Sequence, residues 1–292
     1  MFSFINKLKK GLFVKQLKYY YYPDKKDDRD FIFKTTKKRL PPKVTLEKFV
    51  REIENQEKTN SCTANAACSS LELKALSLGI NVNLSRLFVY FNERIDYPKL
   101  KGKDSGAYLR DAFKSINKYG VPSESVWEFN YNLINVQPPK SVYEKAKQNK
   151  VIKYERIKNI QGIKESLYNG NSVIFGMAIG EQFINLNKNI NQQNYKKINN
   201  TDNKLIGYHA MNIIGYDDIK MNVIVENSWG KKWGDNGLCL IPYSVLESDG
   251  QDFWVCTEAL FLNNEIVKPK NNIKNKKNFL QKIIDFLKGF FK

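Results

Sequence analysis

The chain has 292 residues, of which 42% are hydrophobic and 13% aromatic, and this composition excludes a disordered protein. Lysine and arginine outnumber aspartate and glutamate by 48 to 30, which gives a formal net charge of +18. Proteins that bind nucleic acid or anionic membranes have such a balance, but the chain contains no zinc-knuckle, RNA-binding or P-loop pattern. We therefore interpret the charge as a solvated lysine-rich surface and do not expect nucleic acid as a partner.

Residues 1–40 are predicted to form an N-terminal arm. Phe2, Ile5, Leu8 and Leu12 recur near helical spacing, and lysines stand between them. These lysines interrupt the apolar run of about 7–15 residues that a secretory signal needs, so no signal peptide is predicted. Three roles stay open for the arm: a propeptide, a helix on a membrane surface, or a segment packed on the body of the protein.

A candidate nucleophile follows the arm. Cys62 comes after a polar loop and precedes a segment, Ala64 to Leu78, that is rich in Ala and Leu and lacks Pro and Gly. This pattern predicts a buried helix. A cysteine at a helix start faces backbone N–H groups without partners and the positive end of the helix dipole, and both favour the thiolate. A structural cysteine at the head of a core helix would give the same local sequence.

The remainder of the chain changes from a helical to a strand-like pattern. Residues 41–150 contain helical repeats, and residues 151–264 contain short apolar runs that Gly and Asn-Asp clusters separate. We predict a two-lobed α+β protein with a substrate cleft between the lobes. Residues 181–206, rich in Asn and Lys, are interpreted as a mobile loop over the cleft, with a solvated loop of no function as the alternative.

Two further groups complete a candidate catalytic set. His209, the only histidine, lies in Gly-Tyr-His-Ala-Met-Asn, and Asn227 lies in Asn-Ser-Trp-Gly-Lys-Lys-Trp-Gly. A cysteine nucleophile needs a base to take its proton, and the base needs a third group that fixes its tautomer and orientation. Cys62, His209 and Asn227 are the right residue types for these three roles, and their separation in sequence is long.

The four cysteines, Cys62, Cys68, Cys239 and Cys256, form no Cys-x-x-Cys pair. With a single histidine in the chain we predict no metal site and no cofactor. Cys239 and Cys256 could pair if their strands are adjacent, but without a signal peptide we favour free thiols in an intracellular reducing compartment.

Residues 265–292 are predicted to form a basic amphipathic tail. Phe279, Ile283, Phe286 and Phe290 recur at spacings of three and four, with lysines on the opposite face. The segment is too short and too charged to span a bilayer. An anionic membrane surface, a groove on a protein partner, and the body of the protein itself are equally open as its docking site.

Taken together, these motifs resemble the papain-like cysteine peptidases, in particular a bacterial and viral branch with Ser-Cys-Thr-Ala-Asn-Ala at the nucleophile. The resemblance covers about residues 19–262, and its most specific part is Asn-Ser-Trp-Gly-x-x-Trp-Gly-x-x-Gly. It implies a papain-like fold with a helical lobe and a β-barrel-like lobe. It also implies a site in which Cys62 is the nucleophile, His209 the base and acid, and Asn227 the group that orients His209. Gln56 would help to form the oxyanion hole, and Trp229 would shield the His–Asn bond from water.

The expected activity is that of a cysteine endopeptidase, acting on polypeptides through a Cys62 thioester, with Cys62 as thiolate and His209 as imidazolium at rest. The family usually has Gly where Asn60 stands, but Asn tolerates the left-handed backbone better than most residues, so this substitution is compatible with a tight approach to Cys62. The alternative is a catalytically silent scaffold whose cleft is closed by the arm or by the 181–206 loop. We expect a cytoplasmic protein, or one packaged in the virion if its source is viral, and the arm makes it a candidate zymogen.

Overall fold

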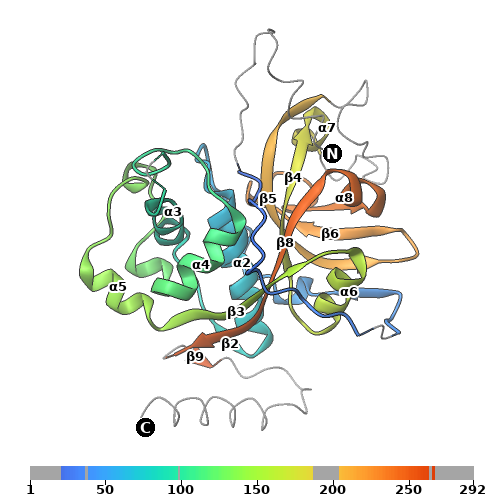
Figure 1. Cartoon of the computed structure of the whole chain (residues 1–292), viewed down its shortest axis with the longest axis horizontal. Coiled ribbons are helices and arrows are strands. Elements are labelled where there is room, and N and C mark those ends of the chain that lie inside the picture. The colour runs from blue at the N-terminus through green and yellow to red at the C-terminus, as the bar shows by residue number, and fades with distance from the viewer. Residues whose placement is uncertain (1–20, 37–38, 98, 187–203, 263–264, 267–292) are drawn as a thin grey trace.

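The structure is a computed structural model that describes residues 21–36, 39–97, 99–186, 204–262 and 265–266 (Figure 1). Within these residues the protein has a lobe of helices beside a lobe built on an antiparallel sheet, so the predicted α+β class is confirmed. The first half of the predicted arm, the central part of the predicted 181–206 loop and the amphipathic tail beyond Ile266 lie outside the described residues.

The helical lobe contains α2, α3, α4 and α5 (Figure 1). The bounds of these helices are Cys62–Ser77, Arg86–Ile95, Leu109–Tyr119 and Lys140–Ala146, and short 3-10 turns lie at Glu47–Phe49, Glu124–Val126 and Tyr131–Leu133. Helix α2 contacts α3 and α4 on one side and the sheet on the other. Because Ala and Leu occupy almost its whole circumference, it can be buried on nearly every side.

The sheet lobe has the strand order β3-β8-β4-β5-β6-β7, and β1 also pairs with β5. All of these strand pairs are antiparallel. The strands are β1 Lys43–Thr45, β3 Asn149–Ile157, β4 Val173–Gly180, β5 Leu205–Asp217, β6 Asn222–Glu226, β7 Leu238–Pro242 and β8 Gly250–Phe261. A separate two-stranded sheet pairs β2 Ile80–Asn81 with β9 Glu265–Ile266. The long strand β5 contacts β1, β4 and β6, so its backbone position is fixed from several sides.

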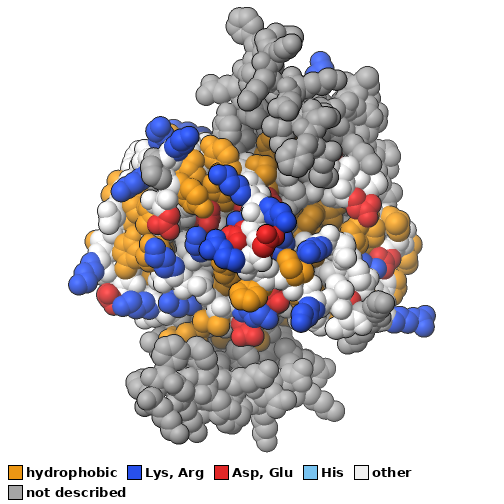
Figure 2. Space-filling model, viewed as in Figure 1, with side chains coloured by type: hydrophobic (Ala, Val, Ile, Leu, Met, Phe, Trp, Pro, Cys, Tyr) orange, Lys and Arg blue, Asp and Glu red, His pale blue; other side chains and the backbone are white. Residues whose placement is uncertain are grey.

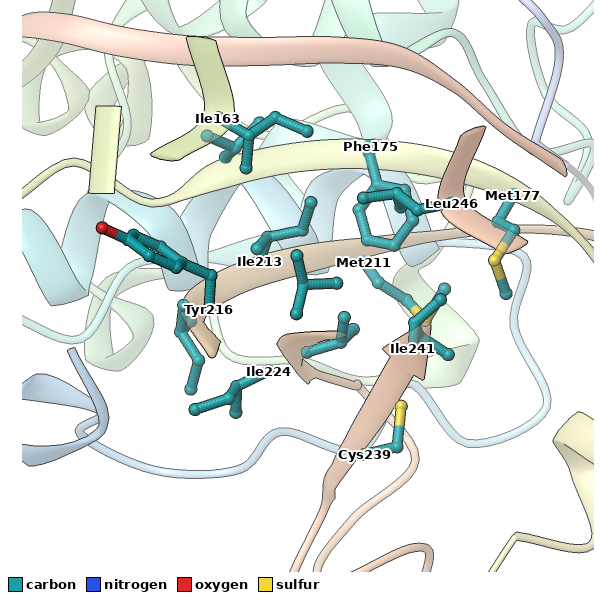
Figure 3. Close-up of a cluster of buried hydrophobic side chains, with 14 of the residues drawn as sticks. Ile163, Phe175, Met177, Met211, Ile213, Tyr216, Ile224, Cys239, Ile241 and Leu246 are labelled. Atoms are coloured by element: carbon teal, nitrogen blue, oxygen red, sulfur yellow. The ribbon is translucent and has the colours of Figure 1, made fainter. Parts of the chain in front are cut away.

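Each lobe has a hydrophobic core of its own. Figure 3 shows the core of the sheet lobe, where Phe175 and Met211 from neighbouring strands meet Leu246 of helix α8 (Tyr243–Asp249). The second core joins α2, α3 and α4 to the facing side of the sheet, to which Ile174 and Trp254 belong. The sheet is therefore apolar on both faces, which explains why β4 reads as a continuous apolar run rather than as an alternating one.

The structure corrects parts of the predicted organisation. The strand-rich part also contains the short helices α6 Ile160–Tyr168, α7 Glu181–Ile184 and α8 Tyr243–Asp249. The predicted 181–206 loop therefore begins as a helix, and its last two residues belong to β5. Strand β1 lies before residue 150 in sequence but pairs with the sheet. All four cysteines are buried and free, so Cys239 and Cys256 do not pair.

Residues 21–36, which we call the N-terminal belt, first pass between the two lobes and then run along the sheet lobe (Figure 1). Arg156 of β3 holds the belt through ion pairs to Asp24 and Asp30, at 2.9 and 3.0 Å, and also pairs with Asp252 of β8 at 2.7 Å. The indole N–H of Trp254 donates to the Asp24 carboxylate at 2.7 Å. Charged contacts with two strands thus fix the belt on the sheet lobe.

The surface and the helix lengths bear on the expected partners. On the face shown in Figure 2, Lys and Arg side chains are dispersed over both lobes, with acidic and apolar side chains between them. Among the described helices, none combines the length and the apolar character that crossing a membrane requires. The part of the chain that the structure describes also holds no cluster of three or more His, Cys, Asp or Glu side chains that could bind a metal ion.

Candidate active site

Cys62 is the first residue of α2, as its sequence context predicts. Only 1% of its surface is exposed, and it accepts a backbone hydrogen bond from Ala210 of β5. The helix start is rigid, because the Asn65 amide donates to both the carbonyl and the hydroxyl oxygen of Ser61, at 2.8 and 2.9 Å. The structure therefore places the thiol of the helical lobe against the residue that follows His209 on the sheet lobe.

His209 and Asn227 form the hydrogen bond that their proposed roles require. The distance between His209 Nε2 and Asn227 Oδ1 is 2.6 Å, and the backbone N–H of Ser228 donates to the same oxygen at 2.8 Å. Two donors thus hold the Asn227 oxygen toward the ring, which is fully buried. This arrangement makes Nε2 the protonated nitrogen of neutral His209, because an amide oxygen can only accept.

Aromatic rings cover the histidine. The Trp229 indole stacks on His209, with ring centroids 4.6 Å apart and an interplanar angle of 27°. Phe183 of α7 meets Trp229 edge-on at 5.4 Å, and Trp233 packs against both. No sequence motif pointed to Phe183, because it lies at the start of the segment interpreted as a loop. Beneath these rings His209 is fully buried and Asn227 is 3% exposed.

Gln56 is locked to the segment that carries Asn227. Its side-chain N–H donates to the carbonyl of Thr59 at 2.8 Å, and its side-chain oxygen accepts from the Ser228 hydroxyl at 2.7 Å. Its backbone N–H also donates to the carbonyl of Ser228 at 2.8 Å. The amide therefore has a defined orientation, with its nitrogen toward the loop that precedes Cys62. Ser228 and Thr59 are positioning residues that the sequence motifs did not single out.

Asn60 does not use the left-handed backbone that an asparagine tolerates. The residue of this loop with a positive φ is Glu57, at 53°. Instead Asn60 binds the segment that precedes α4, since its backbone N–H donates to the Asp104 carboxylate and its side chain to the Asp104 carbonyl, both at 2.8 Å. The Tyr90 hydroxyl donates to the same carboxylate at 2.7 Å. Two hydrogen bonds to Asp104 thus fix the loop where the family usually has glycine.

Burial opposes the charged forms that we expected for Cys62 and His209 at rest. Burial raises the pKa of the Cys62 thiol to about 12. Burial also lowers the pKa of His209 to about 4, against the opposing effect of its hydrogen bond to Asn227. Because each side chain is almost completely withdrawn from water, burial disfavours both charged forms. In this conformation burial therefore favours a thiol and a neutral imidazole over the charged pair.

An open cavity of about 500 Å³ lies beside the aromatic cover. Asn55, Glu57, Ile184, Asn185, Leu186, Trp229, Lys232 and Trp233 line it. Its lining includes Leu186, the last described residue after α7. It also includes Trp229, whose ring stacks on His209. A polypeptide extending from the reaction centre could enter this space.

The comparisons with known proteins now decide the family. The model of the papain family of cysteine proteases matches residues 41–250. The chain belongs to this family. It is 35% identical over 230 residues to an uncharacterized peptidase C1-like protein of Acanthamoeba polyphaga mimivirus, with 74% of this chain and 72% of the relative covered. The resemblance read from the motifs is thereby confirmed.

Solved structures agree on the fold. Xylellain, a cysteine protease from Xylella fastidiosa, has a TM-score of 0.74 at 28% identity, covering 85% of this chain and 97% of its own. Procathepsin B S9 from Trypanosoma congolense has a TM-score of 0.61 at 14% identity, covering 78% of this chain and 82% of its own. The papain-like two-lobed fold is therefore confirmed.

Proposed function

We propose that this papain-family protein is an active cysteine endopeptidase whose reaction centre consists of Cys62, His209, Asn227 and Gln56. The observation that carries the proposal is the buried 2.6 Å bond between His209 and Asn227 beneath the Trp229 ring. A histidine of the core would also need a hydrogen-bond partner, but the combination of this amide, the stacked indole and the neighbouring Cys62 is what a cysteine nucleophile with a base requires. The backbone hydrogen bond between Ala210 and Cys62 supports the proposal as well, because it holds the thiol next to the residue that follows His209.

With Cys62 as a thiol and His209 as a neutral imidazole, the first step includes a proton transfer between them. The imidazole nitrogen that does not contact Asn227 takes the proton of the Cys62 thiol as the sulfur forms a bond to the peptide carbonyl carbon. The carbonyl oxygen becomes an oxyanion, which the Gln56 side-chain amide and the Cys62 backbone N–H stabilise. Removal of one such donor typically lowers the rate by about 10²–10³-fold.

The second half of the reaction returns the proton. His209, now an imidazolium that Asn227 orients, protonates the amine nitrogen as the C–N bond breaks, which leaves a thioester on Cys62. A water molecule then gives one proton to His209 and attacks the thioester carbon. The carboxylic acid departs, and the sulfur recovers its proton from His209.

Active-site labelling tests this proposal. The protein is treated with an epoxide inhibitor of cysteine peptidases, the intact mass is measured, and hydrolysis of a fluorogenic peptide library is followed in parallel. We expect one adduct and hydrolysis with wild type, and neither with Cys62→Ala or His209→Ala. Cys68→Ala is the matched control, because it removes another buried cysteine of the same helix, and it should keep both. An adduct on Cys62→Ala, or loss of the adduct in Cys68→Ala alone, would refute the assignment.

A further inference from the structure

The side-chain amide of Asn227 is held at its oxygen but not at its nitrogen. His209 and the backbone N–H of Ser228 both contact Oδ1, whereas Nδ2 is buried and has no hydrogen-bond partner among the residues that the structure describes. A buried N–H without a partner costs free energy, so proteins normally supply one from a side chain or from an ordered water molecule. We therefore expect a partner for this nitrogen close to the reaction centre.

A small polar cavity lies against Asn227. It leaves about 10 Å³ for the centre of a water-sized molecule, which is about the room that one buried water needs. Its lining includes Ser69 of α2, Asn212 of β5 and Glu226 of β6. Asn212 is 1% exposed, and within the described part of the chain its Oδ1 is a buried acceptor without a partner. The cavity is thus bordered by two amides, one with a donor to be satisfied and one with an acceptor.

One water molecule satisfies both amides. It accepts from Asn227 Nδ2 and donates to Asn212 Oδ1, and its second hydrogen is available to the carboxylate of Glu226, which also lines the cavity. Three polar partners are the usual number for a buried water. A metal cation fits this cavity less well, because it cannot accept a hydrogen bond from the Asn227 amide.

Glu226 connects the cavity to the elements that carry the reaction centre. It is the last residue of β6 and directly precedes Asn227. Its Oε2 accepts from the Ser69 hydroxyl at 2.5 Å and from the Asn212 amide at 3.2 Å. Asn212 pairs with Glu226 in register and also donates to Ser69 at 3.1 Å. Because α2 begins at the nucleophile and β5 carries the base, this cluster joins both elements to the segment of Asn227.

Glu226 changes its charge near neutral pH. It is 6% exposed, and burial raises its pKa from 4.5 to about 7, against the hydrogen bonds that its carboxylate accepts. Glu54, in the loop before α2, raises this pKa further, and Glu54 is itself paired with Arg86 of α3 at 2.9 Å. Glu72 of α2 also interacts with Glu226, and burial keeps Glu72 protonated by raising its pKa. The cluster therefore gains a negative charge between about pH 6 and 8.

We propose that Glu226 is a positioning residue for Asn227 and that it acts through one water molecule bound in this cavity. When Glu226 is ionised, the water donates to its carboxylate and becomes a better acceptor for Asn227 Nδ2. Asn227 Oδ1 then becomes a stronger acceptor for the ring N–H of His209, because hydrogen bonds in a chain polarise one another. The chain stabilises the imidazolium that forms during the reaction. This role in catalysis rests on the peptidase function proposed above, whereas the hydrogen-bonded chain itself does not.

The single histidine of the sequence makes the chain directly measurable by NMR. The nitrogen chemical shifts of the His209 ring are followed from about pH 5 to 9 in Cys62→Ala, which has no thiol at the reaction centre. We expect a small inflection in the Nε2 shift near pH 7, the pKa of Glu226. It should be absent from Cys62→Ala with Glu226→Gln, because the glutamine amide does not ionise. A shift that stays flat in Cys62→Ala, or an inflection that survives Glu226→Gln, would overturn the proposal.

Two further variants of Cys62→Ala separate a specific role from a structural one. Ser69→Ala removes a hydrogen bond to the ionised carboxylate, so it should move the inflection up by about half a pH unit or more. Glu247→Gln, which replaces an exposed glutamate of α8, is the matched control and should leave the inflection in place. Thermal unfolding identifies any variant that fails to fold. If Glu226→Gln does, Ser69→Ala decides, and an unmoved inflection there refutes the proposal.

A high-resolution crystal structure of Cys62→Ala tests the water itself. We expect one water within about 3.2 Å of both Asn227 Nδ2 and Asn212 Oδ1. A dry cavity, or a cation in place of the water, would overturn the bridge between Glu226 and Asn227.

Hydrolysis separates this inference from the proposed function. Between about pH 6 and 8, kcat/KM of the wild type should rise about fivefold more than that of Glu226→Gln, since a hydrogen bond to a charged group replaces one to a neutral group. Equal pH profiles in two hydrolysing proteins refute the role of Glu226 in the reaction and leave the peptidase standing. Absence of hydrolysis by every version refutes the peptidase, and the His209 inflection then still supports the hydrogen-bonded chain.

Discussion

A buried carboxyl group beneath the nucleophile makes the stability of the protein strongly dependent on pH. Glu93 of α3 is 2% exposed, and its carboxylate accepts the hydroxyl of Thr63, the neighbour of Cys62, at 2.7 Å. Burial raises the pKa of Glu93 from 4.5 to about 8, against the opposing effects of Thr63 and Arg94. The folded state therefore prefers the protonated acid, whereas the unfolded chain ionises near its ordinary pKa.

The sign and size of the effect follow from the difference between the two pKa values. A group whose pKa is raised on folding contributes stability that is fully present below about pH 4.5 and is lost as the pH rises through about 8. A pKa that differs by one between the folded and unfolded states corresponds to about 1.4 kcal/mol. The wild type should therefore lose about 4 kcal/mol of unfolding free energy through Glu93 between about pH 5 and pH 9. That loss is a large fraction of the stability of an ordinary domain.

Replacement of Glu93 by glutamine should remove this dependence, because the amide imitates the protonated acid and keeps an oxygen for Thr63. Urea unfolding of wild type and Glu93→Gln at about pH 5, 7 and 9 measures the difference. We expect the two proteins to lie within about 1 kcal/mol at pH 5, and the variant to be more stable by several kcal/mol at pH 9.

The matched control is Glu144→Gln, which replaces a glutamate of α5 that is exposed and paired with Lys147. It should not flatten the fall of stability with pH. Parallel pH profiles for wild type and Glu93→Gln would refute the reasoning, since Glu93 would then be ionised in the folded protein at no cost.

Three further predictions concern the reaction centre. Asn227→Ala should lower kcat/KM about 10–100-fold in steady-state assays, because His209 loses its 2.6 Å partner, and an unchanged rate would contradict the orienting role. Gln56→Ala should lower kcat about 10²–10³-fold with a smaller effect on KM. A rise in KM with kcat unchanged would assign Gln56 to substrate binding instead. Alkylation of Cys62 by iodoacetamide, read by peptide mass, should rise about tenfold per pH unit from about pH 6 to 10, because burial raises the thiol pKa to about 12; a plateau below pH 8 would indicate a thiolate–imidazolium pair at rest.

The sequence was sufficient for the positions of the proposed catalytic residues. Cys62 at the head of a helix without Pro or Gly, and His209 and Asn227 in strand-rich segments, follow from local residue type and spacing. The structure brings together these residues, Gln56 and Trp229. Short helices such as α6 and α8 were missed, because one or two turns between strands give too little periodicity to separate from a loop.

Burial and distant contacts lay beyond the reach of the sequence. The raised pKa of Cys62 and the lowered pKa of His209 depend on how completely both lobes exclude water. No local sequence pattern predicts that exclusion. Nor does any spacing rule connect Asp252 with Tyr21, whose hydroxyl donates to it, since both look like surface residues in their own segments. Asn60 illustrates the same limit, because its substitution for glycine makes sense only with Asp104 beside it.

The belt also has a consequence for the order in which the protein is completed during synthesis. Tyr21 and its partner Asp252 are 231 residues apart, and Asp24 and Trp254 are separated by 230. Contacts of such separation form late, and a growing chain cannot make them until β8 has left the ribosome. The helix that begins at Cys62 is synthesised long before that point. The belt is thus translated first and docks last, and during that interval its partners Asp252 and Trp254 are still without it.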